Sequence, residues 1–256
     1  MTTLNRSYLA LLAGVVAVAL LLVLGVSLAT FYAITGQPAP TASHLGPPGS
    51  ADALGVRDRI AAAPMLDTTS ADATGGTPAL GVLPEIEIPL ADRIGPSGVP
   101  TGYPQSPEGA VGQLGEILVS VLGSMDLAHA QQVQQAWFED PTGSGDVWPV
   151  LGLIQSFLEA GQMPSGLDPG ASLRVVPAAG QLKGSDGDRW HVACVLVKIT
   201  YTFREQAHLA YGHCERMTWT GDRWLIGTGT HPVPAPSTWP GTEPAVRAGW
   251  LAWRDV

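Results

Sequence analysis

Hydrophobic positions follow three different spacings along the chain, and the first is an unbroken run. Tyr8 to Ile34 is 27 residues without a charge, long enough at ~1.5 Å per residue to cross a hydrocarbon core of ~30 Å. The run predicts a transmembrane helix over 8–34, and a cleaved signal peptide, whose apolar part is normally ~7–15 residues, is the alternative. Arg6 is the basic residue of the short tail 1–7, so the tail is expected in the cytoplasm and the rest of the chain outside it.

Residues 35–98 are interpreted as a Pro/Gly-rich linker. Nine Pro and nine Gly lie between residues 36 and 98, and such a composition buries too little apolar surface to offset chain entropy. Two islands interrupt the linker. Residues 50–66 are patterned as a short helix, and PEIEIPL (84–90) alternates apolar and acidic residues as an edge strand does. Each island is expected either to dock on the next domain or to form transient structure.

Residues 99–256 are patterned as one α+β domain. Helical stripes begin near Ser106, Asp126 and Val147. After Gly170 the apolar spacing changes to two, which predicts strands over 172–184, 188–203, 207–220 and 222–228. A C-terminal helix is predicted from Thr242 to Trp253. The expected architecture is three helices over one face of a curved four-stranded antiparallel sheet, a cone, followed by the C-terminal helix.

The charge balance argues against contact with nucleic acid. The chain carries a formal net charge of −9. Residues 99–256 contain fifteen acidic and nine basic residues, and Lys183 and Lys198 are the lysines of the whole chain. Binding to DNA or RNA depends on clustered basic side chains that neutralise phosphates. No such cluster is present in the sequence, so no direct nucleic-acid contact is predicted.

Cys194 and Cys214 are the two cysteines of the chain and lie symmetrically about residue 204. A hairpin that reverses at residue 204 places them opposite each other with Cα atoms ~4.5 Å apart, within the range of a disulfide. A disulfide is predicted, as is usual outside the cytoplasm, and two buried free thiols are the alternative. A zinc site with His191 and His213 is disfavoured because strand alternation places these histidines and the cysteines on opposite faces. No metal or cofactor is predicted.

The residue pattern gives little support to an enzyme. Asp126 and His129 lie one helical turn apart and could form an acid–base pair, although Asp126 is better placed as a helix cap. Tyr201, His208 and Tyr211 lie along the predicted hairpin, where tyrosine packing is ordinary. The sequence has no nucleophile motif, phosphate loop or carboxylate pair, so no catalytic residue is predicted.

Trp239, Trp250 and Trp253 are candidate interface anchors, because large aromatic side chains often dominate the energetics of interfaces. The alternative is packing of the C-terminal helix onto the cone. Packing is expected for at least two of the three.

Four strings carry a resemblance to a known family. They are AAAPML (61–66), GVPTGYPQSPEGAVGQL (98–114), YGHCERM (211–217) and PAPSTWPGTEPAVRAGW (234–250). Together they resemble membrane-anchored proteins carried on integrative and conjugative elements of actinobacteria. The domain over 99–256 is similar to the nuclear-transport-factor-two-like cone of bitopic scaffold subunits in type IV secretion and conjugation channels. The resemblance implies action through self-association and contacts with other channel proteins, and it suggests no catalytic residue.

The leading expectation is a non-enzymatic bitopic membrane subunit of a conjugative DNA-transfer (type IV secretion-like) apparatus that acts as a protein-binding scaffold. Its partners would be other membrane subunits of the channel and further copies of itself. The alternative is a membrane-tethered extracytoplasmic module that binds or converts a small apolar ligand in the cone. An element-encoded exclusion protein is a third reading that the sequence does not separate from the first.

Overall fold

The computed structural model describes residues 55–142, 147–163 and 166–256. These residues belong to one compact unit, Ser50–Val256. The tail 1–7 and the predicted transmembrane helix 8–34 lie outside the described residues. Within the described ranges, no helix combines the length and the apolar character needed to cross a membrane.

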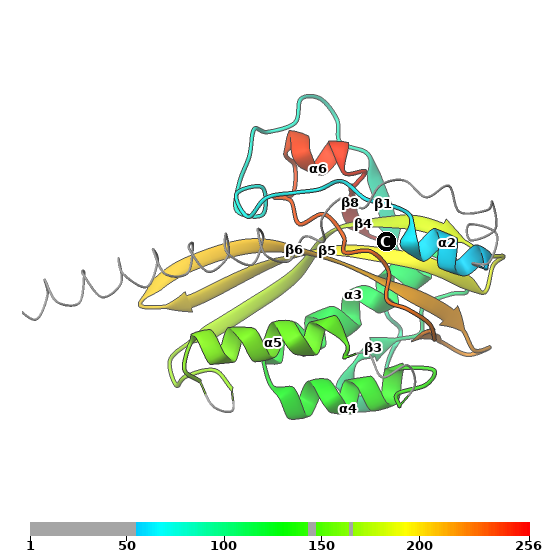
Figure 1. The fold of residues 1–256 in the computed structure, drawn as a ribbon, viewed down its shortest axis with the longest axis horizontal. Coiled ribbons are helices and arrows are strands. Elements are labelled where there is room, and N and C mark those ends of the chain that lie inside the picture. The colour runs from blue at the N-terminus through cyan, green and yellow to red at the C-terminus, as the bar shows by residue number, and fades with distance from the viewer. Residues whose placement is uncertain (1–54, 143–146, 164–165) are drawn as a thin grey trace, which may run out of the picture. The chain divides into compact units, whose positions relative to one another are not determined.

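A curled six-stranded sheet forms the centre of this unit, with the strand order β1-β8-β4-β5-β6-β7 (Figure 1). The long strands are β4 (Ser172–Ser185), β5 (Trp190–Phe203) and β6 (Glu205–Trp219), and the short ones are β1 (Glu85–Ile88), β7 (Trp224–Ile226) and β8 (Leu251–Asp255). β8 runs antiparallel to β4 but parallel to β1. The predicted four-stranded antiparallel sheet is therefore wrong in both strand number and strand direction, because β1 and β8 extend the sheet at one edge.

β1 comes from the range predicted to be linker. Ile86 and Ile88 of this strand are buried, whereas Glu85 and Glu87 point to solvent. Arg254 of β8 holds both glutamates, with its Nε 2.8 Å from a carboxylate oxygen of Glu85 and its Nη2 against Glu87. The alternation of apolar and acidic residues thus suits an edge strand that is docked on the domain. A small hairpin of β2 (Arg93–Ile94), η1 (Pro96–Gly98) and β3 (Pro100–Thr101) follows it.

Three helices cover one face of the sheet: α3 (Pro107–Ser124), α4 (Leu127–Trp137) and α5 (Pro149–Ala160) (Figure 1). Their starts are as the sequence predicts. The Ser106 hydroxyl accepts a hydrogen bond from the Gly109 amide at 3.0 Å and so caps α3. Gly115 of α3 leaves no room for a Cβ, because the Trp253 ring of β8 lies against it. The glycine therefore allows α3 to pack closely against β8.

The opposite face of the sheet is covered as well. The covering layer consists of α2 (Val56–Ala62), the segment 63–83, the segment 227–242 and α6 (Glu243–Arg247) (Figure 1). Arg216 of β6 is buried and its guanidinium lies 2.8 Å from the Asp58 carboxylate of α2. Met65, in the segment 63–83, also packs on this face, with its sulfur 3.7 Å from the Cys214 sulfur. Both islands of the predicted linker are therefore packed on the domain.

The predicted helix over 242–253 is wrong. α6 has five residues, and Gly249, at φ 82°, turns the chain out of the helix and into β8. Glycine adopts this left-handed conformation without strain and commonly ends helices. Trp250 then packs in the core beneath the covering layer, whereas Trp253 packs on the helix side of the sheet. The two tryptophans lie on opposite faces, as positions three residues apart in an extended segment do, rather than on one helical stripe.

The β5–β6 hairpin reverses at Arg204, which adopts φ 63°. Phe203 faces Glu205 across the turn, and the register brings Cys194 opposite Cys214. A disulfide joins these two residues, which confirms the predicted bond. Both cysteines belong to the core beneath the covering layer.

Replacement of Trp250 with Ala should destabilise the protein. Trp250 is 4% exposed and its indole Nε1 donates to the Pro236 carbonyl at 3.0 Å. Loss of a buried aromatic of this size costs about 3–5 kcal/mol in unfolding free energy. Chemical denaturation of the full chain measures the change, and an unaltered transition midpoint would contradict the assignment of Trp250 to packing.

Removal of the disulfide should also destabilise the protein. Cys194 and Cys214 are 20 residues apart, and closing a loop of this length stabilises a fold by about 3 kcal/mol in the chain-entropy treatment. The double variant Cys194→Ala/Cys214→Ala should therefore unfold at lower denaturant. Intact mass of the exported wild-type chain should be lower by two hydrogens than that of the reduced chain, and free thiols there would argue against the bond.

Candidate functional site

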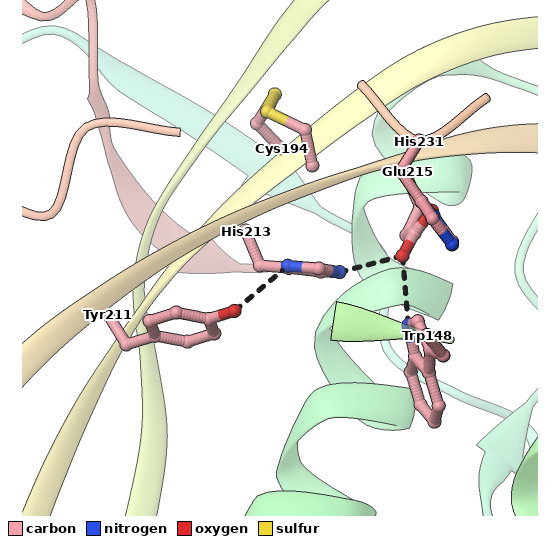
Figure 2. A network of polar contacts seen from close by, with 7 residues as sticks. Trp148, Cys194, Tyr211, His213, Glu215 and His231 are labelled. Carbon is pink, nitrogen blue, oxygen red and sulfur yellow. Dashed lines mark hydrogen bonds and ion pairs between the residues drawn. A yellow bond between two sulfur atoms is a disulfide. The ribbon is translucent and has the colours of Figure 1, made fainter. Parts of the chain in front are cut away.

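A chain of buried polar side chains lies on the helix-covered face of β6. Tyr211, His213 and Glu215 occupy alternate positions of this strand, so their side chains point to the same side of the sheet. Cys214 and Arg216, the residues on either side of Glu215, point to the covering layer. Figure 2 shows the disulfide and the polar chain on opposite sides of the strands.

Glu215 is the centre of this network (Figure 2). Its Oε1 accepts from the Trp148 indole Nε1 at 2.9 Å and lies 2.7 Å from His213 Nε2. Its Oε2 lies 3.3 Å from His231 Nδ1. The Tyr211 hydroxyl extends the chain, 3.1 Å from His213 Nδ1. Both carboxylate oxygens therefore have partners, although the residue is only 1% exposed.

The surroundings keep Glu215 ionised. Burial by itself raises the pKa of a carboxyl group, because it removes water from the charged form. The hydrogen bonds from His213 and His231, together with the positive charge that these rings carry when protonated, outweigh burial and lower the pKa of Glu215 to about 2. A buried carboxylate is tolerated only when it is paired in this way.

The ionised carboxylate orders the protons along the chain. A carboxylate only accepts, so His213 Nε2 donates to Glu215. In the neutral imidazole the other nitrogen, Nδ1, then accepts from the Tyr211 hydroxyl. Burial and the nearby Glu215 charge raise the pKa of Tyr211, which keeps that hydroxyl protonated and able to donate.

This network joins three elements of the domain. Trp148 is the residue that precedes α5, Glu215 lies on β6, and His231 belongs to the segment 227–242. Trp148 is itself fully buried and packs edge-on against Phe138 with ring centroids 5.1 Å apart. The polar atoms of the network bind one another, so the network links these elements inside the domain. Both oxygens of the Glu215 carboxylate are occupied by these contacts.

An apolar cavity of about 190 Å³ lies on the far side of the Tyr211 ring. Leu153 and Phe157 of α5 form one wall, and Ile199, Tyr201, Leu209 and Tyr211 of the hairpin form another. The hydroxyl of Tyr211 is engaged by His213. Tyr211, the last residue of the polar network, therefore lines the cavity with its aromatic ring.

Asp126 and His129, the residues considered as an acid–base pair, have other hydrogen-bond partners in the structure. The Asp126 carboxylate accepts from the His129 amide at 2.8 Å and caps α4, which is the capping role weighed in the sequence. The His129 ring turns to the Ser120 hydroxyl, with its Nε2 2.9 Å from Oγ. Neither side chain lines the cavity. A helix cap and a helix–helix hydrogen bond account for both residues.

The histidines considered for zinc also have other partners. His191 Nδ1 lies 2.8 Å from the Ser185 hydroxyl, and the His191 ring packs on Trp224 with centroids 5.1 Å apart. His213 belongs to the Glu215 network. Over the described ranges, no group of three His, Cys, Asp or Glu side chains is arranged to hold a metal ion.

The candidate tryptophans have different surroundings. Trp250 is buried, Trp253 is half-buried with its Nε1 2.7 Å from Asp255 Oδ1, and Trp239 is half-buried against exposed His208, with ring centroids 4.7 Å apart. All three tryptophans pack on a core, Trp239 from the rim of the cluster beneath the covering layer. Trp239 is the candidate for an interface because its ring also contacts exposed His208.

Sequence reasoning missed Glu215, Trp148 and His231 as parts of one site. A signal existed for the first: Tyr211, His213 and Glu215 occur at a spacing of two within a strand, which places three hydrogen-bonding side chains on one face. Trp148 is 67 residues away from Glu215, and no local pattern announces such a contact.

Comparison with known proteins adds no relative: no family model, no curated protein and no solved structure matches this chain.

Glu215→Gln should lower both the stability and its pH dependence. The unfolded carboxyl titrates near pH ~4.3 and the folded one at about 2. The stabilisation is therefore complete above the unfolded pKa and is lost as the pH falls toward the folded pKa. At neutral pH the variant should lose about 2–3 kcal/mol of unfolding free energy. Denaturation of the full chain between pH 2 and 7 measures both effects.

The exposed Glu205→Gln is the matched control, because Glu205 lies on the same strand at the hairpin turn. It should leave the stability and its pH profile as in the wild type. An equal response of the two variants would mean that the His213 and His231 contacts to Glu215 contribute no net stability.

Proposed function

We propose that the chain is a non-enzymatic subunit of a conjugative DNA-transfer (type IV secretion-like) apparatus, held at the cell membrane through residues 8–34. Its described domain is extracytoplasmic and acts as a protein-binding scaffold. The partners are other membrane subunits of the channel and further copies of this chain. The resemblance of the four sequence strings is the source of the assignment to conjugation.

One observation favours a scaffold over an enzyme: the buried carboxylate of Glu215 is fully engaged by other side chains of the domain. Glu215 has both oxygens occupied and is 1% exposed. A general base must lie within reach of the proton that it abstracts, and no such position is open at this carboxylate. The cavity beside Tyr211 is lined by the ring of that residue and not by the Glu215 carboxylate. Function is therefore assigned to the surface.

The disulfide supports the extracytoplasmic assignment. Such bonds form and persist in oxidising compartments and are rare in the cytosol. The Cys194–Cys214 bond lies in the core beneath the covering layer, where it holds β5 and β6 together. A receptor surface built on these strands would keep its shape without a bound partner.

Trp239 is the surface position that we assign to partner contact. The ring is half-buried and packs at a tilt against the ring of His208, an exposed residue of β6. Tryptophan at an interface gains energy from large contact area at a low cost in side-chain entropy. The pair thus joins the segment 227–242 and the β5–β6 hairpin in one partly exposed aromatic site.

Conjugation frequency in a deletion strain tests the proposal. The strain is complemented either by the full chain or by a secreted form without residues 1–36. Transfer should be lost in the deletion and restored only by the full chain, because a scaffold acts where the membrane subunits are. Unimpaired transfer in the deletion would refute the conjugative role.

Trp239→Ala and Trp250→Ala separate surface from core within the same strain. Trp239→Ala should reduce transfer at least tenfold while the protein is present at wild-type amount. Trp250→Ala should reduce transfer only as far as it reduces the amount of folded protein. Normal transfer with Trp239→Ala would remove this residue from the interface but leave the conjugative role in place.

A further inference from the structure

The apolar cavity beside Tyr211 is separate from the polar network and from the proposed protein-binding surface. It lies between α5 and the turn-proximal half of the β5–β6 hairpin, on the helix-covered face. Its volume is about 190 Å³. Met125, the residue after α3, adopts the left-handed conformation. Its side chain is buried and also lines the cavity.

The walls of the cavity offer almost no polar surface. Leu153, Phe157 and Ile199 supply aliphatic and aromatic carbon. Phe157 and Tyr201 meet edge-to-face, with ring centroids 5.7 Å apart. The hydroxyl of Tyr211 is held by His213, so this residue contributes the face of its ring. A charged ligand would lose its hydration here and gain no partner.

The cavity is open to solvent at the hairpin. Leu209, one of its walls, is 43% exposed, and the neighbouring lining residues Ala207 and His208 are exposed as well. Ile199 at the inner side is 6% exposed. A ligand can thus enter between α5 and β6 without unfolding either element.

From this geometry we infer that the cavity binds a small uncharged aromatic molecule with about eight to twelve non-hydrogen atoms. An apolar cavity of about 150 Å³ lined by Leu, Ile and Phe side chains stays dry and takes up benzene. The present cavity is somewhat larger and richer in aromatic rings, which favours a one- or two-ring ligand through edge-to-face contacts. Its size excludes the whole body of a lipid.

The expected affinity is modest, with a dissociation constant on the order of 0.1 mM for a probe of this size. The ligand neither requires nor changes the Glu215 network, since Tyr211 keeps its hydrogen bond to His213. Occupation of the cavity should instead hold α5 and the hairpin at their present separation. The proposal does not depend on the conjugative role.

Photolabelling of the full chain in lipid nanodiscs tests the inference. The probe is trifluoromethyl phenyl diazirine, a compact uncharged aromatic compound that reacts where it is bound. After illumination, peptide mass spectrometry should find the label on Met125, Leu153, Phe157 or the hairpin residues that line the cavity. Excess indole should reduce this labelling at least fivefold, whereas excess benzoate, an aromatic anion, should not.

Two neighbouring substitutions provide matched variants. Ala207→Phe places a ring in the cavity mouth and should reduce labelling of the lining at least tenfold. Gln206→Phe adds the same ring at the adjacent exposed position, which is not part of the lining, and should leave the labelling unchanged. A cooperative unfolding transition with the wild-type midpoint shows that each variant has folded.

Three results would overturn the inference. They are labelling of the lining no stronger than that of the exposed surface, labelling that indole does not displace, and equal labelling of the Ala207→Phe and wild-type chains. Labelling that follows the lipid content of the nanodiscs and ignores indole would identify a lipid chain as the occupant and would refute the small aromatic ligand.

Discussion

The register of the β5–β6 hairpin is the constraint on which the polar network depends, together with the two cores, one under the helices and one beneath the covering layer. Arg204 forms the turn, and from there each residue of β5 has a fixed partner on β6. A slip of one position would exchange the two faces of a strand. It would separate Cys194 from Cys214 and would turn Glu215 away from Trp148. The disulfide fixes this register covalently.

The same strand carries opposite charges to opposite faces. Glu215 points to the helices and is hydrogen-bonded by two histidines, while the next residue, Arg216, points to the covering layer and is paired with Asp58. A buried charge without a partner is strongly destabilising. The packing of α5, the segment 227–242 and α2 on the sheet is therefore specific, because each element supplies a partner to a charge of β6.

Local signals in the sequence were sufficient for the helices and the long strands. Ser106 and Asp126 are capping residues and so predict the starts of α3 and α4. The symmetry of the cysteines about residue 204 predicts the hairpin register. The same kind of signal failed after Thr242, where valine and tryptophan at helical spacing concealed the turn at Gly249. Spacing of three or four residues is compatible with a short helix followed by a strand.

The covering layer and the site required contacts that no local pattern encodes. The composition of 35–98 is that of a linker, yet part of it, Glu85–Ile88, extends the sheet. Its partners, β8 and the Arg254 guanidinium, lie far along the chain. Trp148 and His231 reach Glu215 from separate elements. Such partners are chosen by tertiary packing, which overrides the preference of a short segment.

The parallel pairing of β1 with β8 also determines which strand forms one edge of the sheet. β8 is next to last in the strand order, and without β1 its outer row of amide and carbonyl groups would be open. An unpaired edge of this kind is a template for strand addition from a second molecule. A domain cut at residue 99, the boundary that composition suggests, would therefore be prone to edge-to-edge aggregation. One that retains Glu85–Ile88 ends instead in a four-residue strand with two exposed glutamates, and short, charged edge strands disfavour strand addition.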